Sequence, residues 1–339
     1  MGLSAVSPDS PLFIQGMWRT GSTYIWNKFR EQPRYRAFSE PFHELLLFEK
    51  EEDLRRKLPA EISLMARHPE LKDFYFAEYE FEALGGIRHF EKRFSYQTYC
   101  LGPESRDVSL QRYLFSLMEV AWRHRQRPVF KFTRGLMRAG WLHARFPSYT
   151  ILLLRRPMDI WNSFVSFPNP YFLVAMCMVV GQNRDHEILG EIARRHDVPF
   201  HIADTYEEDS TFYQGFVAAR QKELYPVLFD LYLLTAVSAA RYADAVVDMN
   251  ELSTNPASLA FVSARLQVGG INLDLADCNL PVYPASVATG NDRAEYEVRA
   301  RPSLRAALNT RLSIRSDKLA SFAPGLSRYS LGLLEEWSV

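Results

Sequence analysis

The sequence has few cysteines, no surplus of charge of either sign and no sign of a linker, and each absence narrows the class of protein. It contains 3 cysteines in 339 residues (Cys100, Cys177 and Cys278) without CxxC spacing, which argues against a disulfide framework or a zinc site and favours a reducing compartment, the cytoplasm. Lys plus Arg and Asp plus Glu both number 40, so no bulk positive charge is available for nucleic acid. We expect no metal site and no nucleic-acid partner.

Long apolar runs are also lacking. The most apolar stretch, Tyr171–Val180, is well short of the ~20 residues that a membrane helix needs, so it predicts a buried helix. Residues 1–10 lack the basic segment and apolar run of a signal peptide, and Val6 stands where a myristoylation motif requires Ser or Thr. We therefore expect a soluble protein with no membrane span.

The sequence does contain five short apolar runs with the length and borders of buried strands: Leu12–Gln15, Tyr35–Phe38, Val129–Phe132, Thr150–Leu154 and Ala245–Asp248. Thr150–Leu154 is almost continuously apolar, as in a parallel sheet covered on both faces. The intervals leave room for helical crossovers. We predict one α/β domain over residues 1–339, with a central parallel sheet and helical insertions at 44–127 and 164–241 that cap the site.

A glycine-containing loop, Gly16–Thr23, lies between the first predicted strand and a predicted helix, Tyr24–Arg30. In this arrangement backbone N–H groups and a helix N-terminus surround an anion. The loop is similar to the Walker A sequence G-x-x-x-x-G-K-[ST], but Ser22 occupies the lysine position, which disfavours an ATP- or GTP-dependent phosphotransferase. A plain strand-to-helix turn capped by Ser22 is the alternative.

A second candidate anion site follows the fourth predicted strand. Arg155 ends that strand, Pro157 suits the first turn of a helix, and Asp159 suits the positive end of the helix dipole. Ser163 lies two turns beyond Arg155. A strand-end cation and a nearby hydroxyl can together hold a phosphate.

Both segments resemble the nucleotide-binding motifs of sulfotransferases that use PAPS (3′-phosphoadenosine 5′-phosphosulfate). The 5′-phosphosulfate loop of that family, (K/R)-(S/T)-G-(S/T)-(S/T), is similar to Arg19-Thr20-Gly21-Ser22-Thr23. The family's 3′-phosphate motif, R-x-P-x-D-x-x-x-S, matches Arg155 to Ser163 without a gap. Similarity covers 12–41 and 129–273. The resemblance implies a P-loop-NTPase-like three-layer fold, PAPS as donor, PAP as product and no metal. It also implies donor-binding residues, namely Arg19, Thr20, Gly21, Ser22, Thr23, Arg155 and Ser163.

The resemblance leaves the general base to be chosen. Cytosolic sulfotransferases carry K-T-H-L-P after the third strand, but the matching residues here are Lys131-Phe132-Thr133-Arg134, so lysine is kept and the histidine is not. Carbohydrate 6-O-sulfotransferases have an E-P pair at the same distance from the loop arginine as Glu40-Pro41. By this resemblance the base is Glu40, with Arg19 and Lys131 as the catalytic cations.

Several alternatives stay open at this point. His43 and Glu44 are other candidates for the base, and Arg134 is expected either to contact acceptor or donor or to form a surface salt bridge. Burial would raise the pKa of Glu40, whereas Arg19 and Lys131 would lower it. The family's R-K-G-x-x-G motif is missing, and Thr289–Arg293 is a polar loop that would take its place over the 3′-phosphate. We expect the acceptor to be a small molecule or glycan, most simply a carbohydrate hydroxyl; a lipid, polyketide or peptide hydroxyl is the alternative.

Overall fold

The computed structural model describes residues 9–64, 71, 73–280, 290–308 and 312–339. Its five strands are β1 Leu12–Gln15, β2 Tyr35–Ser39, β3 Arg127–Phe132, β4 Tyr149–Leu154 and β5 Ala245–Asp248. The helices are α1 Ser22–Arg30, α2 Glu51–Leu64, α3 Val108–Arg123, α4 Ala139–Arg145, α5 Pro157–Val165, α6 Tyr171–Gln182, α7 Glu187–Arg195, α8 Tyr206–Arg220, α9 Tyr225–Ala240, α10 Met249–Leu252, α11 Pro256–Val268, α12 Gly290–Leu308, α13 Ser316–Ala320 and α14 Arg328–Glu335. The 3₁₀ turns are η1 Glu44–Leu46, η2 Lys92–Phe94, η3 Leu136–Arg138, η4 Gln221–Glu223 and η5 Ala323–Gly325.

The strands form one parallel sheet in the order β2-β3-β1-β4-β5, which confirms the predicted parallel sheet of five strands. All five predicted apolar runs are strands, and β1 and β5 begin and end at the predicted residues. Because every strand runs in the same direction, the five carboxyl ends meet at one edge of the sheet. The residues after β1, β2, β3 and β4 are therefore brought together there.

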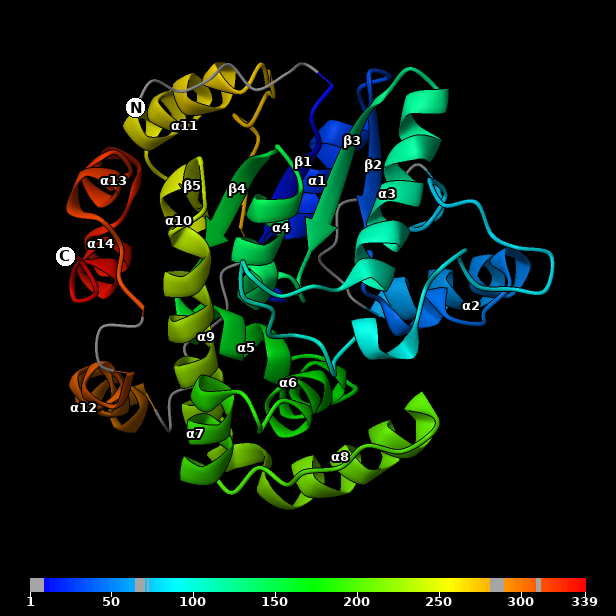
Figure 1. Ribbon diagram of the computed structural model, residues 1–339. Coiled ribbons are helices and arrows are strands. Elements are labelled where there is room, and N and C mark those ends of the chain that lie inside the picture. Colours follow the sequence, from blue (N-terminus) through cyan, green and yellow to red (C-terminus); the bar gives the residue numbers. More distant parts are fainter. Residues whose placement is uncertain (1–8, 65–70, 72, 281–289, 309–311) are drawn as a thin grey trace.

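Helices cover both faces of the sheet, so the molecule has three layers (Figure 1). Along β1 the side chains alternate: Leu12 and Ile14 pack with α1 and α11, whereas Phe13 packs with α3 and α4. Along β4, Leu152 and Leu154 face the cluster that contains α6 and α9. This alternation has the two-residue period of a strand and explains why the strands are apolar on both faces.

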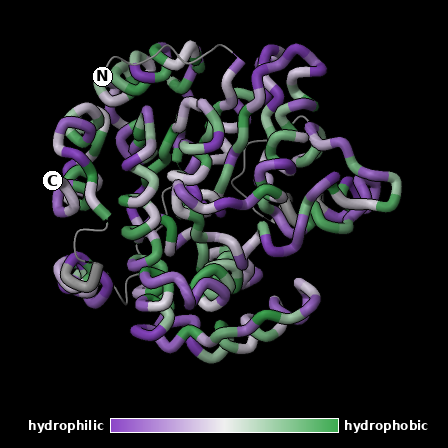
Figure 2. Tube along the Cα trace, viewed as in Figure 1, coloured by the Kyte–Doolittle hydropathy of each residue, from purple (hydrophilic) through white to green (hydrophobic). Residues whose placement is uncertain are grey.

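The helices α6 and α9 consist largely of hydrophobic residues (Figure 2), and nearly all of their side chains are buried inside the molecule. The predicted helix at Tyr171–Val180 is thus confirmed as buried. Among the described residues no single helix is long and apolar enough to cross a membrane; α8 and α9, bent by 97° at their junction, reach that length and composition only as a pair.

The two long insertions differ in how they meet the sheet. In 44–127, α3 packs directly on β3 and α2 lies at the periphery (Figure 1). In 164–241, α9 packs beside β4, and α7 and α8 lie farther out (Figure 1). The description of the chain as one domain with two cap insertions stays a prediction.

One prediction on the C-terminal side is wrong. Thr289 lies outside the described residues, and 290–293 form the start of α12 instead of a polar loop. Tertiary packing holds this helix end: the Arg293 guanidinium lies over the Trp161 ring at 5.2 Å and over the Tyr225 ring at 5.5 Å.

Candidate functional site

The loop after β1 has a backbone shape that a glycine must supply. Gly21, the N-cap of α1, has φ of 91°, and a Cβ atom there would lie 2.8 Å from the Met249 Cε atom. Thr20 donates its hydroxyl to the Met17 carbonyl at 2.7 Å, which closes the turn. The first turn of α1 has no acidic residue, so no negative side chain of that turn competes with an anion for the positive end of the helix dipole.

Arg19 joins the two predicted anion motifs. Its backbone is in the left-handed region, with φ of 66°, which is strained for a residue other than glycine and common at functional sites. Its Nε atom donates to Ser163 Oγ at 2.6 Å, and Arg155 Nη1 donates to the Arg19 carbonyl at 2.9 Å. Arg19 is 136 positions from Arg155 and 144 positions from Ser163 in the chain, yet the three residues form one cluster.

The start of α5 is anchored by a residue that directly follows β5. Asn250 accepts a hydrogen bond from the Arg156 N–H at 2.9 Å and donates to Asp159 at 2.8 Å. Pro157 and Asp159 occupy the first turn of α5, as predicted. Arg155 and Ser163 are both buried, so their polar groups are oriented within the site.

Glu40 is held by two residues, Lys131 from the neighbouring strand β3 and Thr133 from the loop that follows it. Its carboxylate is 3.1 Å from Lys131 Nζ, and it accepts hydrogen bonds from the Thr133 hydroxyl at 2.5 Å and the Thr133 N–H at 3.2 Å. The backbone at Glu40 has φ of 49°, again in the strained left-handed region. Lys131 also contacts Thr23 of the glycine loop, at 3.5 Å, and the Tyr75 hydroxyl.

These contacts decide the ionisation of Glu40. Burial alone would raise the pKa of this carboxyl group, but the charges of Lys131 and Arg134 and the Thr133 hydrogen bond hold its pKa below the usual value. The Glu40 charge in turn raises the pKa of Lys131, against the effect of burial. The group is therefore an ionised carboxylate at neutral pH.

A second buried ion pair lies directly beside Glu40. Arg134 is only 1% exposed at its side chain, so the expected alternative of a surface salt bridge is wrong. Its Nη2 atom donates to Glu44 at 2.8 Å, and its Nη1 atom is 3.9 Å from Glu40. Burial would raise the pKa of Glu44, but Arg134 brings it to about 2, whereas burial lowers the pKa of His43 to about 4. At neutral pH His43 is thus neutral and Glu44 charged.

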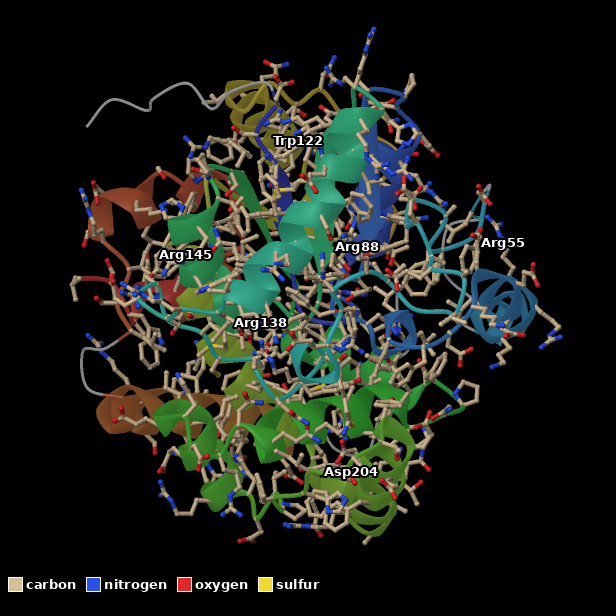
Figure 3. All side chains as sticks on the ribbon, turned by 45° about the vertical axis from the view of Figure 1, so that its right-hand side comes forward. Arg55, Arg88, Trp122, Arg138, Arg145 and Asp204 are labelled. Atoms are coloured by element: carbon tan, nitrogen blue, oxygen red, sulfur yellow. The ribbon has the colours of Figure 1, made fainter. Side chains whose placement is uncertain are left out.

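Sequence reasoning missed some members of this cluster. Thr133 carries no role in the sequence analysis, yet it orients Glu40 through two hydrogen bonds. Tyr96 and Tyr171 also escaped notice; both hydroxyls contact Arg134, at 3.0 and 2.7 Å. Arg138, whose place near one end of α3 is visible in Figure 3, is buried and donates to the Phe94 and Thr98 carbonyls, which fixes the segment that carries Tyr96. No sequence motif marks Tyr96, Tyr171 or Arg138, so their place at the site could not be predicted from the sequence.

The fold and the site define a class before any comparison with other proteins. The parallel sheet with a glycine loop after β1 is a P-loop-like fold, and the arginine and lysine side chains at its carboxyl edge are typical of phosphate-binding proteins with that fold. Residues 11–176 match the model of the sulfotransferase family, and the chain belongs to that family. The protein is thus an enzyme of sulfuryl transfer. No curated protein and no solved structure matches the chain.

Proposed function

We propose that this sulfotransferase takes its sulfuryl group from PAPS and delivers it to a carbohydrate hydroxyl, with Glu40 as the general base. The observation that carries the proposal is the pair of hydrogen bonds that join Arg19 to Ser163 and to Arg155. They bring the predicted 5′-phosphosulfate loop and the predicted 3′-phosphate motif to one place, as a donor with phosphates at both ends of its ribose requires.

The residues at the carboxyl edge suit such a donor. The loop from Arg19 to Thr23 and the N-terminus of α1 would surround the 5′-phosphosulfate, and Arg155 with Ser163 would hold the 3′-phosphate. PAPS supplies a sulfuryl group on a good leaving group, so the protein has only to orient the acceptor, take one proton and stabilise negative charge.

Glu40 is suited to take that proton. As the acceptor oxygen forms its bond to sulfur and the bond from sulfur to the phosphate oxygen breaks, the acceptor proton passes to the Glu40 carboxylate. The leaving phosphate oxygen keeps the electron pair of the broken bond, and Arg19 and Lys131 would stabilise its charge.

The charges around Glu40 support this assignment. Before transfer, Lys131 and Arg134 balance Glu40 and Glu44. Protonation of Glu40 removes one negative charge, so these four side chains together gain a net positive charge at the moment when the leaving phosphate becomes more negative. A buried setting strengthens this interaction because the effective dielectric is low.

The acceptor and the compartment are part of the proposal. The Glu40-Pro41 pair and the missing histidine favour a carbohydrate hydroxyl over a phenol, and a lipid, polyketide or peptide hydroxyl is the alternative. The scattered cysteines Cys100, Cys177 and Cys278 favour the cytoplasm.

Calorimetry with nucleotides tests the donor. We expect the protein to bind 3′,5′-ADP in the absence of Mg²⁺ and to bind ATP much more weakly, because in this proposal Arg155 and Ser163 hold a 3′-phosphate and because Ser22 replaces the lysine of an ATP-binding loop. Folded protein that binds no 3′,5′-ADP, or that prefers ATP, would contradict the proposed donor.

The pH dependence of transfer tests the base. A base must be ionised to act, and the pKa of Glu40 is below its usual value, so we expect single-turnover rates to be flat between about pH 5 and 8 with no acid limb. In Lys131→Met the loss of one positive charge beside Glu40 raises the pKa of Glu40 above that in the wild type, so the activity that remains should fall with decreasing pH at a higher pH than the wild-type activity does. If the wild-type transfer rate instead falls with decreasing pH near neutrality, a group other than Glu40 takes the proton.

A further inference from the structure

The outer face of α3 carries a row of large apolar side chains. Val108, Phe115 and Trp122 are 69%, 46% and 38% exposed, and they follow one another at intervals of seven residues. Because seven residues are almost two whole turns of an α-helix, the three side chains lie on one face, offset by only about 20° at each step. The Phe115 and Trp122 rings lie edge to face with their centroids 5.7 Å apart. We call these three residues the α3 stripe.

The α3 stripe is turned away from the core. The opposite face of the helix is buried against the sheet through residues such as Leu110, Leu114 and Leu117. In Figure 3 the helix crosses the face turned toward the viewer, with Trp122 labelled near its carboxyl end. Single exposed apolar residues are normal on a protein surface, but several in a row on one helix face are typical of a surface that packs against another.

Two opposite charges accompany the α3 stripe. Arg112 and Glu119 are exposed, and among the described residues neither has a hydrogen-bond or ion-pair partner through its side chain. Helical spacing places both on the same flank of the stripe, about 10 Å apart along the axis, whereas charges within one helix pair at a spacing of three or four residues. The exposed Arg123 is already paired with Glu80 at 2.7 Å. The stripe thus has no surplus of free positive charge for a lipid surface.

A second copy of α3 has the complementary arrangement. If two copies of the helix pack antiparallel about a two-fold axis close to Phe115, Arg112 of each copy lies opposite Glu119 of the other. Val108 of each copy then packs near Trp122 of the other, and the two Phe115 rings meet near the axis. This symmetry keeps a side chain on the same flank in both copies, so two equal ion pairs form beside one apolar seam. A parallel pair would place the charged flanks on opposite sides and leave the charges unpaired.

We propose that α3 is the contact surface of a two-fold symmetric homodimer, with the two α3 stripes packed against each other and Arg112 paired with Glu119 across the axis. One helix from each copy makes a small interface, so we expect a weak dimer that dissociates in the micromolar range. The inference is independent of the proposed donor, base and acceptor, because it depends only on the outer face of α3.

Sedimentation velocity of the full chain between about 1 and 200 µM tests the dimer. The wild type should shift from monomer to dimer over this range. Glu119→Arg and Arg112→Glu should each raise the dissociation constant about tenfold or more, because both ion pairs become pairs of like charge. Phe115→Glu should abolish the dimer, whereas Phe48→Glu, at a side chain that is 78% exposed on another segment, should leave it unchanged.

Mixing the two charge variants tests the antiparallel arrangement itself. When Glu119→Arg and Arg112→Glu proteins are combined in equal amounts, each arginine meets a glutamate of the other chain, so a mixed dimer should form about as readily as the wild-type dimer. All of these substitutions are at exposed side chains, so Tm should stay close to the wild-type value and loss of the dimer cannot be ascribed to unfolding.

Two results would overturn the proposal. A wild type that stays monomeric over the whole concentration range would mean that something else covers the α3 stripe, such as another protein or residues 1–8 of this chain. A dimer that persists in both charge variants, or that mixing the variants fails to restore, would mean that a different surface or a different arrangement of α3 holds the two copies together.

Discussion

Glu40→Gln should lower turnover by about 10²- to 10⁴-fold, the usual contribution of a general base, and leave 3′,5′-ADP affinity unchanged. Glutamine keeps an oxygen that can accept the Thr133 hydrogen bonds, so the side chain stays in place, but it cannot take a proton. The measurement is single-turnover transfer from radiolabelled PAPS, with calorimetry of 3′,5′-ADP on the same preparation. Wild-type turnover in this variant would remove Glu40 from the role of base.

The substitution also breaks a buried ion pair, and that effect has to be separated from catalysis. Loss of one partner of such a pair costs about 3–5 kcal/mol, because Lys131 would keep a buried charge without Glu40. Glu78→Gln is the control: Glu78 is half-buried, with a side chain that is 13% exposed, and it pairs with Arg30 at 2.6 Å, but it lies near the amino end of β2, where its carbonyl accepts from Arg36. We expect the control to lose stability and to keep its turnover. Equal losses of turnover in both variants would point to stability as the cause.

Arg155→Ala should remove the preference for a 3′-phosphate. Hydrogen bonds to charged groups contribute about 1.5–3 kcal/mol, so the affinity for 3′,5′-ADP should fall about 10- to 150-fold while that for 5′-AMP changes much less. Because Arg155 also supports the Arg19 carbonyl, both affinities can weaken, and the ratio between the two nucleotides is the decisive quantity. Calorimetry with each nucleotide measures it.

The next residue in the chain provides the control. Arg156 has the same charge, but its side chain is 57% exposed and pairs with Asp159 at 3.3 Å. Arg156→Ala should therefore leave the ratio of 3′,5′-ADP to 5′-AMP affinity as in the wild type. A similar change of ratio in both variants would mean that general charge, and not the position of Arg155, sets the preference.

The two experiments address different halves of one site. Glu40 acts on the proton of the acceptor, and Arg155 on the far phosphate of the donor, so the proposed function requires a loss of rate in one variant and a loss of affinity in the other. The hydrogen bonds around Arg19 connect the halves, and Lys131 touches both Glu40 and Thr23 of the glycine loop.

Much of the architecture followed from the sequence alone. Strands β1 and β5, the loop around Gly21 and the start of α5 at Pro157 all depend on residues that are close together in the chain. Short apolar runs, a glycine with a positive φ and a proline in a first turn are local features, so local patterns were sufficient to predict them. The two nucleotide-binding motifs that indicated the sulfotransferase family are also short, continuous stretches of the chain.

Only the tertiary structure decided the character of the site. The order β2-β3-β1 places Glu40 beside Lys131 and Thr133, and this neighbourhood sets the direction in which its pKa moves. Likewise, Arg293 of α12 packs against the Trp161 ring, a contact between distant parts of the chain, in a segment for which a polar loop was predicted. Strand order and burial are long-range properties. The charged residues can be read from the sequence. The fold determines which of them are in contact and how far they are shielded from water.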